Sequence, residues 1–588
     1  MTTDDSRASL LMAVRDSMVS AGLDGLYIGR GDRFQGEEVR PCDEFLSWLT
    51  GFSGSAGTAI IMADTAAVFS DQRYTLQMAR QLDSSLFTAH DVSVLSPMDW
   101  LAQHKQGARI GLNGWAVSKA SYDKMAAHPA TPQLVSLDEE FLAAHWQDRP
   151  DAAISPVWSL PPADAGQSVS DKLADLTDEL SSHAHAACLI TAPDAVNWLL
   201  NIRGRDLKHT PFHLCYALIG KHEHTASANI TLIGADTSAR QSADYLISFD
   251  DVADHCQDRG YQRLLCDAAS LPLALYEQLS AAGLELIMRD EPSLARKARK
   301  NDAERAGFEA AHLADGVAMM RFWYWLAHIA DRTALTEADI ADRLTEIRSR
   351  HPDYICDSFP TIAGMGGNGA IVHYRAEKGH DAGLADDGVL LLDSGAHYRY
   401  GTTDITRSFA LGAVSEEAVQ AATFVLAAHI ELATARFPQG TTGAQLDALC
   451  RRPLWQAGLD FGHGTGHGVG HVLSVHEGPV SISKRSHRAV EAGHLLSNEP
   501  GYYKEGHFGI RLENLVITEP CHKHVGADML AFETVTLCPF DQKLIAPSLL
   551  TEAHRNWLNS YHRTVAERLR PHLEPEVADF LDQLTRPV

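Results

Sequence analysis

The sequence predicts an α/β protein built from several domains. The chain has 588 residues, of which 45% are apolar and 21% charged, and this length is typical of two to four globular domains. Helical patterns alternate with short strand-like runs in the first half, including residues 22–29, 65–72, 187–191 and 228–234. Such alternation of helical and strand patterns is typical of α/β folds.

Two changes in composition divide the chain. Residues 146–168 contain Pro150, Pro156, Pro161 and Pro162, which disfavour a continuous helix or a central strand. Residues 288–308 pass from a turn into a charged helical start, and an amphipathic pattern then continues to Trp325. These changes predict domains at 1–160, 161–295 and 296–588.

A weak internal repeat links the first two predicted domains. Residues 48–54, WLTGFSG, correspond to residues 198–204, WLLNIRG, and an apolar run follows each segment. The repeat is consistent with duplication of one domain. Two unrelated helix ends that both need a residue with positive φ, Gly51 and Asn201, would explain it equally well.

Charge and targeting signals limit the classes of partner and the compartment. Lys and Arg total 50 against 76 Asp and Glu, a formal charge of −26, which argues against binding nucleic acid or an acidic membrane surface. The nine cysteines include no CxxC pair, which indicates a reducing compartment. The acidic start has no secretory signal pattern, and no apolar run reaches the ~20 residues of a membrane span. We therefore expect a cytoplasmic protein.

Two aspartates bracket a predicted hairpin. The apolar run at residues 388–392 ends in Asp393, and Asp404 follows eleven residues later in GTTDITRSF. A hairpin would bring the two carboxylates together. Either residue alone is more often a turn former that hydrogen-bonds its own backbone, so the pair needs support from elsewhere in the sequence.

Residues 461–470, FGHGTGHGVG, supply that support. Five glycines in ten residues make a helix unfavourable, since each interior glycine costs roughly 0.8–1 kcal/mol relative to alanine. Glycine instead permits close approach of the backbone. His463 and His467 lie within this segment, and two imidazoles beside such a backbone suit a metal or ligand site better than a structural role.

Two further acids follow in LSNEPGYYKEGHFGIRLENLVIT. Glu499 precedes Pro500, and Glu513 lies in an apolar run that indicates partial burial, which a carboxylate tolerates when it is paired or bound to metal. With Asp393, Asp404 and His467, these acids form an oxygen-rich set without a thiolate. Such a set favours harder divalent ions, Mn²⁺ among them. Five ligands exceed the three usual for one catalytic zinc, which indicates a two-metal site with bridging carboxylates.

The segments DSGAHYRYGTTDITRSF, HGTGHGVGHVLSVHEGP and NEPGYYKEGHFGIRLEN resemble three signature stretches of the Xaa-Pro aminopeptidases, in order and spacing. The resemblance extends to FLSWLTGFSGSAGTAII and VNWLLNIRGRDLKHTPF, and the length is similar to that of the long cytosolic form. It implies two creatinase-like N-terminal α/β domains followed by a C-terminal pita-bread catalytic domain.

The resemblance also implies roles for the five ligand candidates. Asp404 and Glu513 would bridge two divalent metal ions, and Asp393 would hold one of them. His467 and Glu499 would complete the coordination of the other ion. Manganese is the preferred metal by resemblance, with zinc or cobalt as alternatives, since such sites discriminate weakly among these ions.

Four further residues receive roles by resemblance. His373, His463 and His476 would contact the substrate and take part in catalysis, although His373 alone would be a routine loop histidine. Arg511 would orient an acidic ligand, an arrangement common around metal sites. The alternative for Arg511 is a plain surface ion pair.

The implied activity is release of the N-terminal residue from peptides with proline in second position. A hydroxide bridging the two metals would attack the first carbonyl carbon, and Glu499 would carry the proton to the leaving nitrogen. The family also implies a homodimer, with Xaa-Pro peptides as partners.

Three alternatives remain open. Prolidase has the same ligand types but cleaves dipeptides with C-terminal proline, and two N-terminal domains together with the HGTGHGVG…VHEGP pattern favour the aminopeptidase. Methionine aminopeptidase has the same catalytic fold, but the long N-terminal half disfavours it. Metal-free binding modules and creatinase-like enzymes also exist on this fold, although such relatives lack the complete ligand set.

Overall fold

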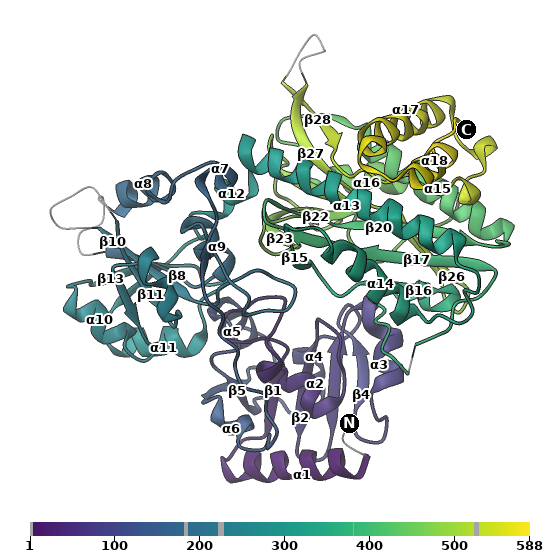
Figure 1. Cartoon of the computed structure of the whole chain (residues 1–588). Helices are drawn as coiled ribbons and strands as arrows, with labels where there is room; N and C mark the ends of the chain where they lie inside the picture. The colour runs from purple at the N-terminus through teal and green to yellow at the C-terminus, as the bar shows by residue number, and fades with distance from the viewer. Residues whose placement is uncertain (1–3, 181–185, 222–227, 380, 522–527) are drawn as a thin grey trace. The chain divides into compact units, whose positions relative to one another are not determined.

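The chain packs as two compact units. The computed structural model describes residues 4–180, 186–221, 228–379, 381–521 and 528–588. The first unit comprises Met1–Leu160, Gln167–Lys208 and Phe212–Ser293, and the second comprises Pro161–Gly166, His209–Pro211 and Leu294–Val588. Both units mix helices and strands (Figure 1), which confirms the predicted α/β class.

The first sheet of the first unit has six strands in the order β4-β3-β2-β1-β5-β6. β1 pairs antiparallel with β2 and parallel with β5, while β3–β4 and β5–β6 are parallel pairs. The strands are β1 Gly25–Gly29, β2 Thr58–Met62, β3 Ala66–Ser70, β4 Thr88–Asp91, β5 Arg109–Asn113 and β6 Gln133–Leu137.

A second sheet in the same unit repeats this topology, with the order β12-β11-β10-β8-β13-β14. β8 takes the place of β1, because it pairs antiparallel with β10 and parallel with β13. The strands are β8 Ala186–Ile190, β10 Tyr216–Lys221, β11 Ala228–Ile233, β12 Tyr245–Ile247, β13 Arg263–Cys266 and β14 Glu285–Met288. The matching order and directions support duplication of one domain.

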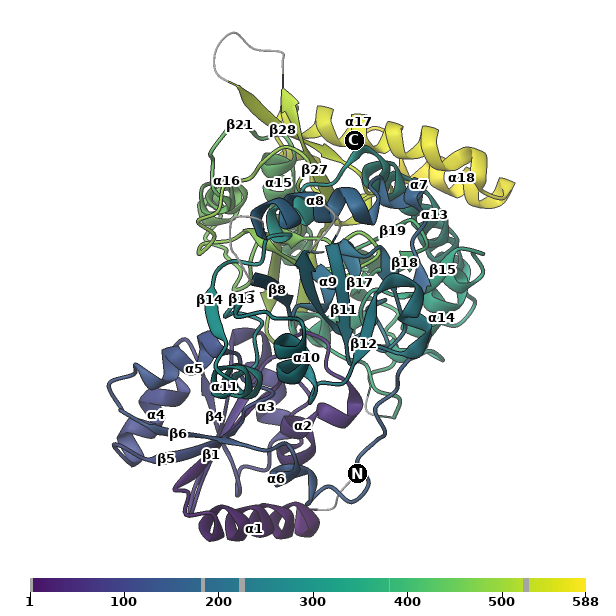
Figure 2. The same cartoon turned by 90° about the vertical axis from the view of Figure 1, so that its left-hand side faces the viewer.

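Helices cover the faces of these sheets. In β2, Ala59 and Ile61 belong to one buried cluster and Ile60 to another, the alternation expected of a strand buried on both faces. The helices are α1 Asp4–Ser20, α2 Phe45–Thr50, α3 Thr75–Gln81, α4 Pro97–His104, α5 Lys119–Ala126, α6 Glu140–Ala143, α8 Val169–Leu180, α9 Pro193–Leu199, α10 Val252–Asp258 and α11 Leu273–Ala281. The short strands β7 Trp158–Ser159 and β9 Ile202–Arg203 pair with each other. Figure 2 shows the helical cover from the side.

Gly51 and Asn201 occupy equivalent turns after α2 and α9. Their φ angles are 81° and 50°, so both adopt the left-handed conformation. The positive φ inferred for both positions of the repeat is therefore confirmed. A Cβ at Gly51 would also overlap the guanidinium of Arg7, whereas the Asn201 side chain accepts a 2.7 Å hydrogen bond from Lys172.

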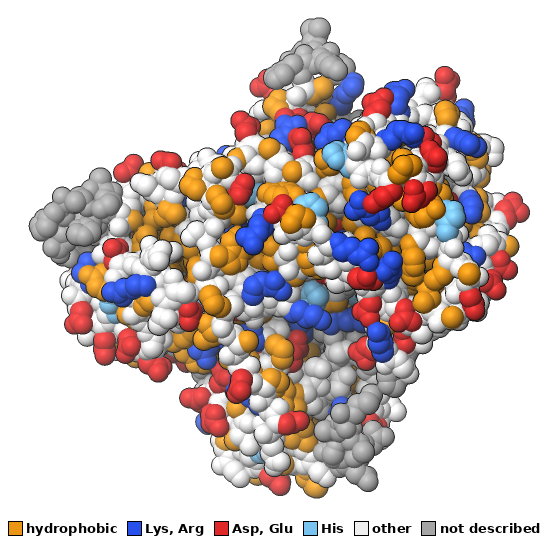
Figure 3. Space-filling model, in the orientation of Figure 1, with side chains coloured by type: hydrophobic (Ala, Val, Ile, Leu, Met, Phe, Trp, Pro, Cys, Tyr) orange, Lys and Arg blue, Asp and Glu red, His pale blue; other side chains and the backbone are white. Residues whose placement is uncertain are grey.

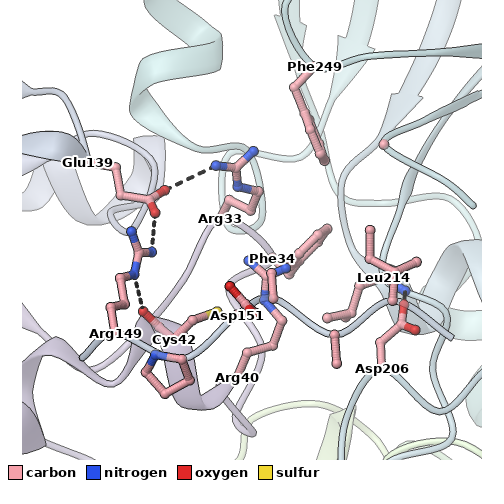
Figure 4. Close-up of a pocket in the computed structure, with 15 residues that line it drawn as sticks. Arg33, Phe34, Arg40, Cys42, Glu139, Arg149, Asp151, Asp206, Leu214 and Phe249 are labelled. Carbon is pink, nitrogen blue, oxygen red and sulfur yellow. Dashed lines mark hydrogen bonds and ion pairs between the residues drawn. The ribbon is translucent and has the colours of Figure 1, made fainter. Parts of the chain in front are cut away.

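A cavity of about 460 Å³ lies in the first unit (Figure 4). Glu139 on its wall accepts a hydrogen bond from Arg33 at 3.1 Å and pairs with Arg149 as well. Arg149 also donates to the Cys42 carbonyl at 2.7 Å, and the Arg33 guanidinium lies 4.8 Å from the ring centroid of Phe249. These charged side chains pair with one another in the wall of the cavity. The site residues predicted from the sequence are not among the residues that line it.

The described part of the second unit contains four sheets. The sheets run β15-β18-β19, β16-β17-β20, β21-β28-β27-β24-β22-β23 and β25-β26. The strands are β15 Tyr354–Asp357, β16 Ile362–Met365, β17 Gly388–Ser394, β18 Ala396–Tyr398, β19 Gly401–Thr402, β20 Ile405–Leu411, β21 Arg436–Pro438, β22 Gly466–Gly468, β23 Glu477–Ile482, β24 Leu495–Asn498, β25 Gly501–Lys504, β26 Phe508–Arg511, β27 Asn514–Cys521 and β28 Met529–Thr534. The predicted strand at residues 388–392 is confirmed as part of β17.

Isolated β-bridges lie outside these strands, and in the described part of the second unit they join Arg299 to His494, Thr336 to Gly383 and Thr442 to Ala489. Each bridge ties the residues around a helix start to a neighbouring loop. They extend the pairing beyond the sheets themselves.

The helices of the second unit pack on these sheets. The helices are α7 Pro162–Ala165, α12 Leu294–Ala298, α13 Asp302–His328, α14 Glu337–Ser349, α15 Glu416–Ala433, α16 Gly443–Gln456, α17 Glu552–Leu569 and α18 Pro575–Leu584. α13 begins with a capping box in which Asn301 accepts from the Glu304 amide and the Glu304 side chain accepts from the Asn301 amide. The predicted helix with a charged start is confirmed. Trp323 packs against Phe409 of β20, with ring centroids 4.8 Å apart.

Charged side chains of both signs mix on the face drawn in Figure 3. Exposed ion pairs of the described residues include Arg321–Glu574 at 2.8 Å, and pairs of this kind contribute about 0–1 kcal/mol each. None of the helices in the described ranges combines the length and apolar character needed to cross a lipid bilayer.

Buried neutral histidines make the second unit sensitive to acid. Burial, together with the charge of Arg407, lowers the pKa of His562 on α17 to about 3, and the Phe540 amide donates to its Nε2 at 3.1 Å. Below the ordinary histidine pKa of ~6.5, His562 becomes protonated in the unfolded chain but stays neutral in the folded chain. The free energy of unfolding should therefore fall by up to ~1.4 kcal/mol per pH unit between pH 6 and 4 for this group.

Urea unfolding at pH 7.5, 6 and 5 checks this dependence. His562→Gln keeps an acceptor for the Phe540 amide and should flatten the pH slope. His487→Gln, at an exposed position, is the matched control and should leave the slope unchanged. Equal slopes in the parent and in His562→Gln would contradict the assignment.

Candidate metal centre

Antiparallel pairing of β17 and β20 brings the two predicted aspartates to one place. Asp393 lies on β17 opposite Thr406 of β20, and Asp404 immediately precedes β20. Both aspartates are buried, at 8% and 4% exposure. The predicted proximity across a hairpin is therefore confirmed.

A second strand pair carries the two glutamates. β24 and β27 pair so that Asn498 lies opposite Asn514, and Glu499 and Glu513 directly adjoin these two residues. The Glu513 amide donates to the Thr406 carbonyl at 3.1 Å, and the Thr406 hydroxyl donates to Glu513 Oε2 at 2.8 Å. These bonds link Glu513 to the strand that carries Asp404. The burial predicted for Glu513 is confirmed at 2% exposure.

His467 lies on the short strand β22. Its Nδ1 is 2.9 Å from the Gly468 carbonyl, which can only accept, so Nδ1 carries the proton and Nε2 is left with a lone pair in the neutral ring. Nε2 lies 3.4 Å from Asp404 Oδ2 and 3.5 Å from Glu499 Oε1. One ligand atom each from Asp404, His467 and Glu513 fall within 4.8 Å of one another.

Close backbone approach explains the glycines around His467. A Cβ at Gly466 would overlap the Ser497 carbonyl, and a Cβ at Gly468 would overlap the Glu477 carbonyl. The Ser497 hydroxyl accepts a hydrogen bond from the His467 amide at 2.9 Å. The segment is extended rather than helical, as its glycine content predicts.

Burial raises the pKa of Asp393, Glu499 and Glu513. The neighbouring negative charges raise them further, and the pKa of Glu513 lies well above its usual range because the carboxyl is buried and because Asp404, Glu499 and Asp393 surround it. Arg511 opposes the shift at Asp393. Like charges this close stay ionised together only when positive charge is added.

The donor set fits divalent cations. Oδ1 of Asp393 is buried and accepts no hydrogen bond from the described residues, although an ionised carboxylate is acceptor-only and costly to bury unpaired. Four carboxylates and one imidazole with a free Nε2 lone pair are ligands that Mn²⁺, Co²⁺ and Zn²⁺ accept. The residues present therefore fit the metals expected from the sequence.

Arg511 and Tyr503 link the acids to the glycine-rich segment. Arg511 is buried, and its Nη2 donates to Asp393 Oδ2 at 2.5 Å while its Nη1 donates to the Tyr503 hydroxyl at 2.7 Å. The Tyr503 hydroxyl lies 2.7 Å from His463 Nε2. Because His463 Nδ1 faces the Gly464 carbonyl at 2.7 Å, Nε2 of the neutral ring accepts from Tyr503.

Sequence reasoning did not select Tyr503. Its position four residues after Glu499 in NEPGYYKEG carries no signal by itself, since an aromatic residue in a strand is usually part of the core. Burial raises the pKa of Tyr503 to about 12, so its hydroxyl keeps its proton at neutral pH.

His373 and His476 lie on loops that reach the same region. The Val372 carbonyl accepts a 3.5 Å hydrogen bond from Arg511, which places the half-buried His373 beside the site. His476 is exposed, and its ring meets the ring of His467 edge to face, with centroids 4.3 Å apart at 88°. The residues selected from the sequence therefore gather in one region of the second unit.

Comparison with known proteins follows the same division of the chain. The model of metallopeptidase family M24 matches residues 306–520, and the model of its C-terminal region matches 528–588. Creatinase/prolidase N-terminal domain models match residues 11–144 and 148–304.

Two fungal proteins named Probable Xaa-Pro aminopeptidase P align over 98% of this chain. The protein of Talaromyces marneffei is 34% identical over 92% of its length, and that of Coccidioides posadasii is 36% identical over 93%.

The chain belongs to metallopeptidase family M24. A solved M24 structure, the X-prolyl aminopeptidase of Caenorhabditis elegans, is similar over the full length of both chains, with a TM-score of 0.91 and 29% identity. It is described as a cytosolic enzyme with a di-nuclear active site. The family predicted by resemblance is confirmed, as is a fold of two creatinase-like α/β domains followed by a pita-bread domain.

We expect His467→Ala to weaken Mn²⁺ binding by roughly 100-fold or more, because it removes the Nε2 atom that would bind the metal. Loss of a residue that only hydrogen-bonds a metal ligand typically costs ~10–100-fold in metal affinity. Elemental analysis after dialysis and calorimetric titration measure this. His487→Ala, at an exposed position, is the matched control. Full metal content in His467→Ala would rule out His467 as a ligand.

Proposed function

We propose that this M24 protein is a Xaa-Pro aminopeptidase, which releases the first residue of peptides that have proline in second position. The observation that carries the proposal is the buried acid cluster with His467 Nε2 directed at Asp404 and Glu499. The names of the fungal relatives and of the similar nematode enzyme support the same substrate class.

The proposed metal centre holds two divalent ions, Mn²⁺ in preference to Zn²⁺ or Co²⁺. Asp404 and Glu513 would be shared by both ions, Asp393 would bind one, and His467 and Glu499 would bind the other. The two strand pairs support this division, because Asp393 and Asp404 come from one pair and Glu499 and Glu513 from another. When bound, such ions act as Lewis acids that lower the pKa of a bound water and polarise a carbonyl.

Glu499 would move the proton in this reaction. Its carboxylate would accept a proton from the attacking water as the oxygen bonds to the carbonyl carbon of the first residue. As the C–N bond breaks, Glu499 would deliver that proton to the proline nitrogen, which leaves as a secondary amine. The Ser497 hydroxyl, 3.1 Å from Glu499 Oε1, supports the orientation of the carboxylate.

The histidines would contact the substrate. His373 and His476 would donate hydrogen bonds to the developing oxyanion, and the edge-to-face contact of His476 with His467 supports its placement. His463, hydrogen-bonded to Tyr503, would form part of a pocket for proline. Arg511 would orient Asp393, to which it donates.

Domain organisation, compartment and assembly complete the proposal. We propose domains at 1–160, 161–295 and 296–588, a cytoplasmic location and a homodimer. The description of the nematode relative as cytosolic supports the compartment.

Hydrolysis of Arg-Pro-Pro and Arg-Ala-Ala by chelated protein, with and without added Mn²⁺, tests the activity. We expect metal-dependent release of arginine from Arg-Pro-Pro alone, detected by mass spectrometry. Cleavage restricted to Xaa-Pro dipeptides would instead identify a prolidase, and no cleavage under any metal would favour a binding module.

Glu499→Gln should abolish cleavage while the fold persists, because the amide cannot accept and deliver the proton. A fall in kcat of at least ~100-fold is expected for loss of a general base. Steady-state kinetics together with circular dichroism measure both properties. Unimpaired turnover would remove Glu499 from the mechanism.

A further inference from the structure

Two lysines and one glutamate form a buried ion cluster in the second unit. Lys297 Nζ lies 2.9 Å from Glu477 Oε2, and Lys300 Nζ pairs with Glu477 Oε1. The three side chains are only 1–2% exposed. Lys300 Nζ also donates to the Lys297 carbonyl at 3.1 Å. The cluster joins the segment that enters the catalytic domain to the VHEGP motif.

Such a cluster is a poor source of stability. Desolvation of buried ions costs several kcal/mol each and commonly exceeds the attraction between them. The neighbouring Arg299 avoids this desolvation cost, because the side chains of Arg299 and its partner Glu491 are both about half exposed. We therefore expect the buried cluster to fix a particular local conformation rather than to add stability.

Glu477 lies at the start of β23, where this strand pairs irregularly with β22. His467 of β22 pairs with Ser481, whereas the next residue, Gly468, pairs with Glu477 of β23, so the register shifts by three residues. Gly468 has no Cβ to obstruct the Glu477 carbonyl. The shift places the residue before Glu477, His476, with its ring against that of His467.

We propose that Lys297 and Lys300 are positioning residues for His476. By holding both carboxylate oxygens of Glu477, they fix the irregular pairing of β22 and β23 that sets the His476 ring against His467. This inference rests on the proposed function, in which His476 contacts the substrate.

Lys300→Met is the primary test, because it leaves a charge-balanced Lys297–Glu477 pair and keeps a long apolar stem. We expect full metal content, a kcat for Arg-Pro-Pro lowered about tenfold and a KM changed less than twofold. Arg299→Met is the matched control from the same segment and should keep the parent kcat. An unchanged kcat in Lys300→Met would overturn the proposal.

A double-mutant cycle with His476→Ala separates positioning from general structural support. If Lys300 acts through His476, Lys300→Met should change kcat by less than twofold in the His476→Ala background. The same tenfold loss in both backgrounds would contradict the proposal. If Lys300→Met does not fold, a variant without charge in the cluster replaces it, Lys297→Met/Glu477→Gln/Lys300→Met. The same changes in kcat and in the His476 resonance are expected for that variant.

A readout without turnover separates this inference from the proposed activity. In protein labelled with ¹³C at histidine Cε1, the His476 resonance is assigned by its loss in His476→Ala. We expect Lys300→Met to shift or broaden this resonance and Arg299→Met to leave it in place. An unmoved resonance in Lys300→Met would refute the positioning role, whether or not the parent protein cleaves Arg-Pro-Pro.

Discussion

Mutual repulsion of three buried carboxylates and one partly buried carboxylate is the constraint on which the second unit depends. Asp393, Asp404, Glu499 and Glu513 meet in a region where burial raises the pKa of three of them. One guanidinium, that of Arg511, donates directly to Asp393. A protein gathers acids in this way at a cost in stability, and bound cations would remove that cost.

Strand pairing, rather than local sequence, brings these acids together. Each carboxylate lies at or next to the end of a paired strand, and two hydrogen bonds between Thr406 and Glu513, one donated by each residue, join the two strand pairs. The strands are in turn held by the core under α13, where Trp323 packs on Phe409. The geometry of the site is therefore sensitive to packing far from the ligands.

The sequence predicted the fold class and the set of polar residues that gather at the site, because the glycine-histidine alternation is specific, the acids follow it in one segment, and the family resemblance covers the remaining positions. It could not identify Tyr503, whose hydroxyl joins His463 to Arg511 only after β25 and β26 pair. Nor did it indicate the contact of Lys297 with Glu477, since 180 residues separate them and lysines in the last turn of a helix are usually solvated. Long-range pairing of charges depends on tertiary packing.

The equivalent turns at Gly51 and Asn201 illustrate how two copies of a domain diverge. At Gly51 the left-handed backbone itself disfavours a side chain, and a Cβ there would also displace the guanidinium of Arg7. At Asn201 the same backbone conformation accommodates a side chain. Its amide oxygen accepts a hydrogen bond from Lys172, and its amide nitrogen donates one to the Gln167 carbonyl. One turn thus has no side chain at this position, while the other uses its side chain to attach two neighbouring segments. A left-handed turn kept at the same place in both sheets is what duplication of one domain would leave behind.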